Sequence, residues 1–258
     1  MVRFFFILMV SLFSISAAGQ GKSIVKGKID SEIPVKNTEE KTNLVNYAVK
    51  KNTVPALIPF KKNGKYGFID HEGKMIIAPV YSDAGFFTTD CNLLNSPNEK
   101  IQKFGSDQYA TVRLNDADYR VNSLGKRVYQ YIPKDLGRCP AEFKKQRYHA
   151  YIMNYSYGII EDATFENPGD YRQFTIYPQY QYLHILEGDD LNNPMIVAVR
   201  NNRFGIIDLR GKTIIPFIYK DIKRNYSWKL ARLFQVSLDG KNYFYLDENN
   251  RAYGENFL

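Results

Sequence analysis

An internal repeat constrains the fold of this chain more than any other feature of its sequence. Residues 66–74 and 204–212 have the same order of residue types: an aromatic residue, Gly, two apolar residues, Asp, two variable residues, Gly and Lys. The similarity continues through residues 75–81 and 213–219, each of which contains one Pro and ends on Tyr. A recurring unit of this kind cannot bury its apolar face alone, so neighbouring units are expected to stack.

Three fainter copies lie between and after these two. Residues 119–126 keep the Gly-Lys end, residues 157–161 keep the front, and residues 243–250 keep the strand but place Asn where Gly stands elsewhere. An acidic residue or Asn recurs at the end of each apolar segment; the series is Asp70, Asn122, Glu161, Asp208 and Asp247. The steps between these positions are uneven, which predicts insertions between otherwise similar units.

A dipeptide typical of tight hairpin turns precedes each copy. Asn-Gly and Asp-Gly between apolar segments favour such turns because both residues tolerate positive φ. The dipeptides occupy residues 63–64, 115–116, 154–155, 201–202 and 239–240. Tyr155 is the one poor fit among them. Each unit is therefore predicted to be a three-stranded antiparallel meander.

The clearest copies also predict strand limits. In the first, residues 56–62 pair with residues 65–70, and a third strand covers residues 74–77. Pro79 is expected to end that strand because proline cannot donate to a ladder. The fourth copy repeats the arrangement with strands at residues 195–200, 203–208 and 212–215.

Backbone geometry explains the glycines of the repeat. Gly64, Gly73 and Gly211 are predicted turn residues, whereas Gly67 and its counterpart Gly205 lie inside a strand. Glycine inside a strand indicates close approach by another backbone or a ring. Gly64 and Gly67 do not have the spacing of a phosphate-binding loop, and a strand rather than a helix follows them.

The recurring carboxylates are predicted to stabilise turns. An Asp side chain can accept a hydrogen bond from the backbone two residues further on, as expected for Asp70 and Asp208. Every unit needs such a turn, whereas a pair of catalytic carboxylates would be needed only once. We therefore interpret these acids as structural.

The repeat pattern resembles that of the WG-repeat (KWG-type) proteins of bacteria. Tyr66 and Phe204 stand where that family usually has Trp. The resemblance covers residues 56–258 and is most specific in the first and fourth copies. It implies tandem β-rich units, often in exported proteins, and no established catalytic residues. The expected fold is all-β: three-stranded antiparallel meanders that form a curved array or a propeller-like assembly.

The N-terminus is typical of a secretory signal. Arg3 precedes an apolar segment at residues 4–15, and small residues follow up to Gly19. The apolar segment is shorter than the ~20 residues that span a bilayer. We therefore predict a signal peptide at residues 1–18 and an exported protein. A leader at residues 19–55 follows, with a short helix within residues 38–51.

Two cysteines and the charge bear on the compartment and the partners. Cys91 and Cys139 are candidates for a disulfide in an oxidising compartment, the alternative being two separately buried thiols. The first cysteine lies far from the cleavage site, so the protein is not predicted to be a lipoprotein. The net charge of +8 comes from scattered Lys and Arg, which indicates a solvated basic surface rather than a nucleic-acid site.

No constellation of residues predicts catalysis, a metal or a cofactor. His71, His149 and His184 lack the spacing of metal ligands. His71 occupies a variable turn position and is expected to be exposed to solvent. No catalytic residue and no cofactor are predicted.

The segment at residues 148–182 is rich in Tyr. It overlaps residues 161–194, which the repeat pattern predicts to be the longest insertion. Tyr177, Tyr180 and Tyr182 are expected to point the same way in an extended segment. With Tyr171 they form the candidate binding residues, because Tyr gives rigid contact area for a sugar or peptide. The alternative is that these rings fill half-buried strand faces.

Three functions follow from these features. The first is an exported, non-enzymatic binding module of the cell envelope whose partner is a glycan, a peptide or an envelope protein. The second is an envelope hydrolase with its site in residues 161–194, which predicts buried acids that converge near Tyr177. The third is a structural scaffold without a ligand.

Overall fold

The computed structural model describes residues 53–140, 145–166, 170–188 and 190–254. The predicted signal peptide and the helix expected within residues 38–51 lie outside this part of the chain. Among the residues described, no helix has the length and the apolar character needed to cross a bilayer.

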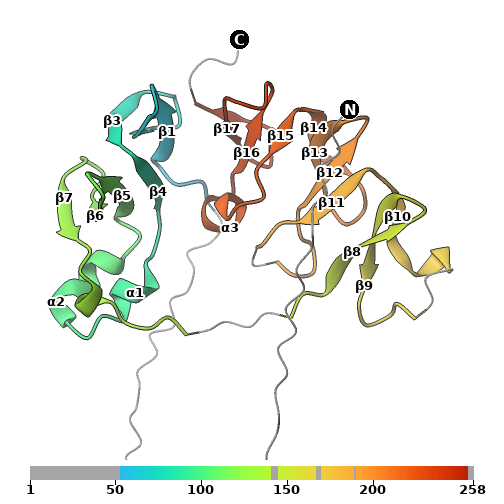
Figure 1. Cartoon of the computed structure of the whole chain (residues 1–258), viewed down its shortest axis with the longest axis horizontal. Helices are drawn as coiled ribbons and strands as arrows, with labels where there is room; N and C mark the ends of the chain where they lie inside the picture. Colours follow the sequence, from blue (N-terminus) through green and yellow to red (C-terminus); the bar gives the residue numbers. More distant parts are fainter. Residues whose placement is uncertain (1–52, 141–144, 167–169, 189, 255–258) are drawn as a thin grey trace, which may run out of the picture. The chain divides into compact units, whose positions relative to one another are not determined.

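Five antiparallel sheets follow one another along the chain (Figure 1). We name them sheets A to E in chain order. Sheet A contains β1 (Ile58–Lys62), β2 (Lys65–Ile69) and β3 (Met75–Tyr81). Sheet B contains β4 (Asp83–Phe87), β5 (Ala110–Leu114), β6 (Ala117–Val121) and β7 (Arg127–Gln130). Sheet C contains β8 (Tyr148–Met153), β9 (Ser156–Glu161) and β10 (Phe174–Tyr180).

Sheets D and E complete the series. Sheet D contains β11 (Tyr182–Ile185), β12 (Ile196–Arg200), β13 (Arg203–Ile207) and β14 (Thr213–Tyr219). Sheet E contains β15 (Asp221–Ile222), β16 (Phe234–Ser237), β17 (Phe244–Leu246) and β18 (Ala252–Tyr253). The predicted all-β fold of tandem antiparallel meanders is confirmed.

The short helices of the described residues all lie in connections between strands. Between β4 and β5 the chain forms α1 (Cys91–Leu94), α2 (Glu99–Gln102) and η1 (Lys103–Gly105). The others are η2 (Pro133–Asp135), η3 (Tyr171–Gln173) and α3 (Ser227–Ala231). Sheets B, D and E gain a fourth strand because the chain passes from the third strand of one unit directly to the edge of the next sheet.

Four of the five predicted hairpin turns have the expected geometry. In the first, Asn63 and Gly64 have φ of 50° and 78°, and the pairs at 115–116, 154–155 and 201–202 also have two consecutive positive φ values. This is the pattern of a type I′ turn, which matches the twist of the flanking strands. The fifth turn differs, because Gly240 alone has positive φ. There Asp239 accepts hydrogen bonds from the backbone N–H groups of Lys241 and Asn242.

The recurring acid stabilises the second turn of the unit, as predicted. Oδ1 of Asp208 accepts hydrogen bonds from the backbone N–H groups of Arg210 and Lys212, at 2.9 and 2.8 Å. Equivalent pairs of bonds form at Asp70, Asn122 and Asp247. Glu161 is the exception, since its carboxylate instead accepts a hydrogen bond from Arg147 Nε at 2.7 Å.

The third strand does not end at Pro79, so that prediction was wrong. The register moves from Phe68 opposite Ile77 to Tyr66 opposite Tyr81, which leaves extra residues bulging across from Gly67. Pro79 lies in this bulge, where its missing N–H interrupts no regular ladder bond.

The bulge also explains the glycine of the middle strand. A Cβ on Gly67 would lie 2.8 Å from the nitrogen of Pro79. The same overlap occurs at Gly158 with the nitrogen of Pro178, at 2.9 Å, and at Gly205 with the ring of Phe217, at 3.0 Å. The close approach predicted for this glycine is therefore an approach by the third strand of its own unit.

Successive residues of the middle strand contact different neighbouring sheets. In sheet A, Phe68 packs into a core shared with sheet B, whereas Ile69 packs into a core shared with sheet E. In sheet D, Ile206 faces sheet E and Ile207 faces sheet C. The first and last sheets of the chain therefore share a core.

His71 belongs to this contact between the first and last sheets and is not simply a solvent-exposed turn residue. Its ring lies edge-on to the ring of Tyr253, with centroids 5.3 Å apart. Its Nε2 is 2.7 Å from the carbonyl oxygen of Pro55. The expectation of full exposure failed because the repeat does not reveal which neighbour lies beside a turn.

In the described part of the chain, the four apolar clusters do not join sheet B to sheet C. Each sheet covers the corresponding face with its own connection. On sheet B, Arg120 takes the place of Phe68, is 1% exposed and donates hydrogen bonds to the carbonyl oxygens of Phe104, Thr88 and Ser106. On sheet C the rings of Tyr151, Phe165 and Phe174 form a cluster. Such covered faces are expected at the ends of a stack of repeats.

A disulfide joins Cys91, the first residue of α1, to Cys139, with Cα atoms 5.5 Å apart. Asp90 precedes it and caps α1 by accepting hydrogen bonds from the backbone N–H groups of Asn92 and Leu93. The bond fastens the segment after sheet B to the helical connection that covers Arg120.

Candidate functional site

The candidate tyrosines do not form one surface. Tyr180 is 4% exposed and lies in the core shared by sheets C and D, where it stacks on Phe217 with ring centroids 6.2 Å apart. Tyr177 is 50% exposed. The two are three positions apart along β10, so their side chains lie on opposite faces of the strand. The expectation of a common direction was wrong.

The other two candidates belong to different elements. Tyr182 begins β11, is half-buried and lies edge-on to Tyr157, with centroids 5.7 Å apart. Tyr171 lies in η3, and its side chain is outside the described part of the structure. Residues 161–194 are not one insertion, because they contain β10 and β11. The true insertions are the connections on either side of those strands.

The acids that the structure describes in this segment do not form the buried group that a hydrolase site near Tyr177 predicted. Glu161 is paired with Arg147, and Glu166 and Asp190 are exposed. Asp189 lies outside the described residues.

Two adjoining pockets lie beside β11. The first has a volume of about 290 Å³ and the second about 400 Å³. They share the lining residues Gln146, Ile185, Leu186 and Glu187. We call the two together the β11 groove.

Connections of three consecutive sheets line the β11 groove. They are the segment that leads into β8, the connection from β11 to β12, and the connection from β15 to β16. Each of them comes immediately before the meander of its own sheet. In repeat proteins, insertions at equivalent positions lie on one face, which is often the binding face.

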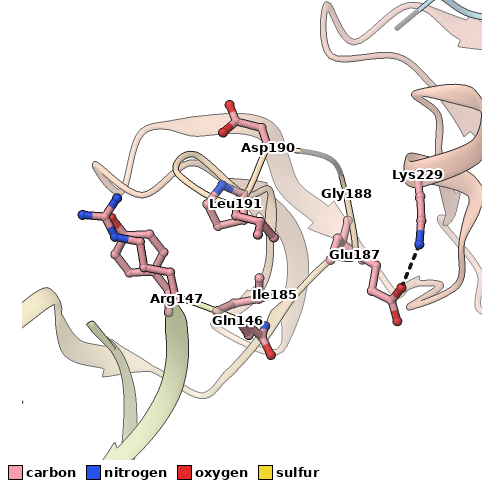
Figure 2. Close-up of a pocket in the computed structure, with 11 residues that line it drawn as sticks. Gln146, Arg147, Ile185, Glu187, Gly188, Asp190, Leu191 and Lys229 are labelled. Atoms are coloured by element: carbon pink, nitrogen blue, oxygen red, sulfur yellow. Dashed lines mark hydrogen bonds and ion pairs between the residues drawn. The ribbon is translucent and has the colours of Figure 1, made fainter. Parts of the chain in front are cut away.

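Charged side chains lie at two walls of the first pocket, and Figure 2 shows the ion pair at one of them. Arg147 lies on one side, where it donates hydrogen bonds to Glu161 at 2.7 Å and to Oδ1 of Asn192 at 2.6 Å. On the other side, Lys229 Nζ lies 3.5 Å from Oε2 of Glu187. Arg147, Glu187 and Lys229 at these two walls therefore each have a partner of opposite charge within the fold.

The second pocket is more polar in its side chains. His184 of β11 and His149 of β8 both line it, together with Arg224, Asn225 and Tyr226 from the connection before α3. Tyr226 is 56% exposed, so part of its ring is available for contact.

The two histidines differ in environment. His149 Nε2 lies 3.3 Å from Oδ2 of Asp162. Burial, followed by the positive charge of Arg224, lowers the pKa of His184, and Glu187 acts in the opposite direction. Among the described residues there is no group of three or more His, Cys, Asp or Glu arranged to hold a metal ion.

The family model of the WG containing repeat matches residues 66–93 and 204–241. The chain therefore contains the WG repeat in these two segments. These matches begin in the first and fourth copies of the predicted repeat, in sheets A and D. A search of curated proteins finds no match.

One solved structure, titled "Crystal structure of the eukaryotic initiation factor", resembles this chain at 12% sequence identity and a TM-score of 0.28. The similarity covers 80% of this chain and 54% of that one, so the chain spans about half the length of the protein it matches. At this TM-score the likeness supports no statement about fold or function.

The matched WG segments cross from one sheet to the next. Residues 204–241 begin at β13, continue through the fourth strand β15 and reach the end of β16. They therefore include the connection that supplies Arg224 and Tyr226 to the β11 groove. Repetition of this connection along the chain is what places similar insertions beside one another.

Reasoning from the sequence missed most of the groove. His149 and His184 lack the spacing of metal ligands, and Gln146, Arg224 and Tyr226 belong to no motif of the sequence. Part of the signal was available: two of the three connections follow the Pro-x-Tyr element at residues 178–180 and its Pro-x-x-Tyr counterpart at residues 216–219.

Proposed function

We propose that this WG-repeat protein is an exported, non-catalytic binding module, and that the β11 groove holds a glycan. The observation that carries the proposal is the convergence of connections from three consecutive sheets on one pair of pockets. The repeat supplies a rigid framework, and the connections supply the side chains that vary.

The size and chemistry of the second pocket suit a sugar unit. A volume of about 400 Å³ falls in the range of small-molecule sites, ~300–1,000 Å³. A sugar ring presents an apolar face that packs on an aromatic ring, and hydroxyl groups that need donors and acceptors. Tyr226 offers the ring, and Asn225, Gln146 and His149 offer polar groups.

The groove is built on fixed elements. β11 pairs with β12 from Tyr182 to Ile185, and Leu183 and Leu186 are buried in the cores on either side of sheet D. A site whose backbone is already ordered loses little conformational entropy on binding.

Export is part of the same proposal. It rests on the signal-like sequence of residues 1–18 and agrees with the disulfide between Cys91 and Cys139, because such bonds persist in oxidising compartments. A glycan of the cell envelope is then an accessible ligand. Fractionation of cells that express the full chain tests this part: the protein should be found outside the cytoplasm, with its N-terminal residues removed.

Binding is tested by titration calorimetry of the purified protein with a panel of oligosaccharides. Replacement of the ring by Tyr226→Ala should weaken the best ligand about tenfold or more, since central aromatic contacts often contribute over ~1.4 kcal/mol. Tyr155→Ala is the matched control, because Tyr155 is fully exposed on a hairpin turn and does not line the groove. No binding by any oligosaccharide, or equal binding by the two variants, would contradict the proposal.

A further inference from the structure

We propose that the glycan bound in the β11 groove carries a carboxylate, and that Arg224 together with His184 binds it. This inference rests on the proposed function and adds the charge of the ligand. A uronic acid residue is the chemical class that combines a sugar ring with a carboxylate at its edge.

The first step of the argument is the incomplete pairing of Arg224. Its nearest acid is Asp221, with Nη2 and Oδ1 3.8 Å apart. Asp221 also accepts a hydrogen bond from the hydroxyl group of Tyr243 at 2.6 Å and lies 3.5 Å from Lys223 Nζ. One carboxylate is therefore shared by three groups, and Arg224 is the most distant of them.

Arg224 thus has hydrogen-bonding capacity that the fold does not use. A guanidinium group has five N–H donors, and among the described residues none of those of Arg224 is assigned a hydrogen bond. Its side chain is 39% exposed and lines the second pocket. A planar guanidinium binds a carboxylate through two parallel hydrogen bonds, which makes an acidic group its best-matched partner.

Aromatic rings fix the position of this guanidinium. Cζ of Arg224 lies 5.7 Å from the ring centroid of Tyr182 and 5.9 Å from that of Phe204. These rings stabilise the positive charge without neutralising it. The fork is therefore held in place before a ligand arrives.

The other charges of the groove leave this end positive. Glu187 is the one acid among the lining residues of the second pocket, and it is paired with Lys229 on the side of the first pocket. His149 faces Asp162, with Nε2 and Oδ2 3.3 Å apart. A bound carboxylate would therefore meet Arg224 and His184 without an unpaired acid beside it.

Proton uptake by His184 links this binding to pH. The depressed pKa of His184 means that the imidazole is mostly neutral in the empty groove at neutral pH. A bound carboxylate favours the charged imidazolium and raises this pKa, so a proton is taken up on binding. Affinity should then rise as the pH falls through the pKa of the complex and level off below the pKa of the empty groove.

The neutral ester of the same sugar gives the decisive comparison. Trigalacturonate and its methyl ester are titrated into the full protein by calorimetry, at about pH 5 and about pH 8. The acid should bind severalfold more tightly at the lower pH, whereas the ester should bind about tenfold or more weakly than the acid and show no such dependence. His184→Asn should remove the pH dependence of the acid.

Variants of Arg224 test whether this residue binds the carboxylate. Arg224→Gln should lower the affinity for the acid about tenfold or more and leave the affinity for the ester unchanged. Arg224→Lys keeps the charge but loses the planar guanidinium, so its affinity for the acid should be intermediate. Arg210→Gln is the matched control, because Arg210 is exposed on a turn of the same WG segment. Thermal unfolding of each variant establishes that it is folded.

The outcomes separate this inference from the function beneath it. If the acid and the ester bind equally and Tyr226→Ala weakens both, the proposed recognition of a carboxylate is wrong but the glycan site remains supported. If an acidic tetrapeptide bound more tightly than every saccharide, the proposal that the ligand is a uronic acid would be wrong. If Arg210→Gln weakened binding of the acid as much as Arg224→Gln, the assignment of Arg224 as the binding residue would be wrong. The absence of all saccharide binding would overturn both proposals.

Discussion

Gly67 lies directly against the backbone of Pro79, so that a Cβ on this glycine would be 2.8 Å from the proline nitrogen. The obstacle is main chain of the adjacent strand, which cannot rotate away as a side chain can. We therefore expect Gly67→Ala to lower the free energy of unfolding by about 3 kcal/mol or more, at the upper end of overpacking costs. Urea denaturation followed by far-ultraviolet circular dichroism measures this difference.

Gly85→Ala provides the matched control for this prediction. A Cβ there would lie 3.6 Å from the carbonyl oxygen of Thr111, which is ordinary contact, and Gly85 is also in a strand. Its effect should stay within about 1 kcal/mol. Equal destabilisation by the two substitutions would show that the bulge does not explain the glycine.

The turns were predictable from the sequence because their chemistry is local. The Asn-Gly pair at residues 63–64 needs only its own backbone preferences to form a type I′ turn, and Asp208 reaches the N–H groups of its own turn. The bulge was not predictable in this way. The rule that proline ends a strand holds for a regular ladder, and the compensating Gly67 lies in a different strand.

The β11 groove was less predictable still. Its residues come from three connections that are adjacent only because sheets C, D and E pack together. The tyrosine-rich segment was predicted to hold the site instead. Tyr180, however, ends the same Pro-x-Tyr element as Tyr81, and Tyr219 ends a version that is one residue longer. Aligning that element would have assigned Tyr180 to the core.

Replacement of Tyr155 by Gly is predicted to stabilise the protein, whereas replacement of Gly67 is predicted to destabilise it. Tyr155 has φ of 61° and is fully exposed, so it adopts a left-handed conformation without any packing in return. Relief of this strain should make Tyr155→Gly more stable by about 0.5–1 kcal/mol. Because Asn tolerates this conformation and β-branched residues do not, stability should follow the order Gly, Asn, Tyr, Val. A variant with Val that is as stable as the Gly variant would contradict the assignment of strain.

The disulfide between Cys91 and Cys139 spans a sequence separation of 48 residues. In the chain-entropy model a loop of this length contributes about 4 kcal/mol by restricting the unfolded chain. The Cys91→Ala/Cys139→Ala variant should therefore unfold at a markedly lower urea concentration than the oxidised protein. Dithiothreitol should destabilise the natural protein and leave the double variant unchanged. An equal response of the two proteins to the reductant would argue against a structural disulfide.

Replacement of Arg120 tests how sheet B covers the face that shares no apolar cluster with sheet C among the described residues. Replacement by Met keeps much of its length but leaves the carbonyl oxygens of Thr88, Phe104 and Ser106 without their donor in a buried site. We expect a loss of about 3–5 kcal/mol, typical of removing one partner from a buried charged network.

Arg113→Met is the control for this last prediction, because Arg113 lies in the same sheet but makes an exposed ion pair with Asp118. Its loss should leave the urea midpoint close to that of the natural protein, because exposed ion pairs contribute little. Hydrogen exchange adds a local readout: Arg120→Met should speed exchange in α1, α2 and η1 before it affects sheet D, since the hydrogen bonds of Arg120 end on the residues around those helices. Uniform acceleration across sheets B and D would mean that Arg120 supports the whole fold rather than this covering connection.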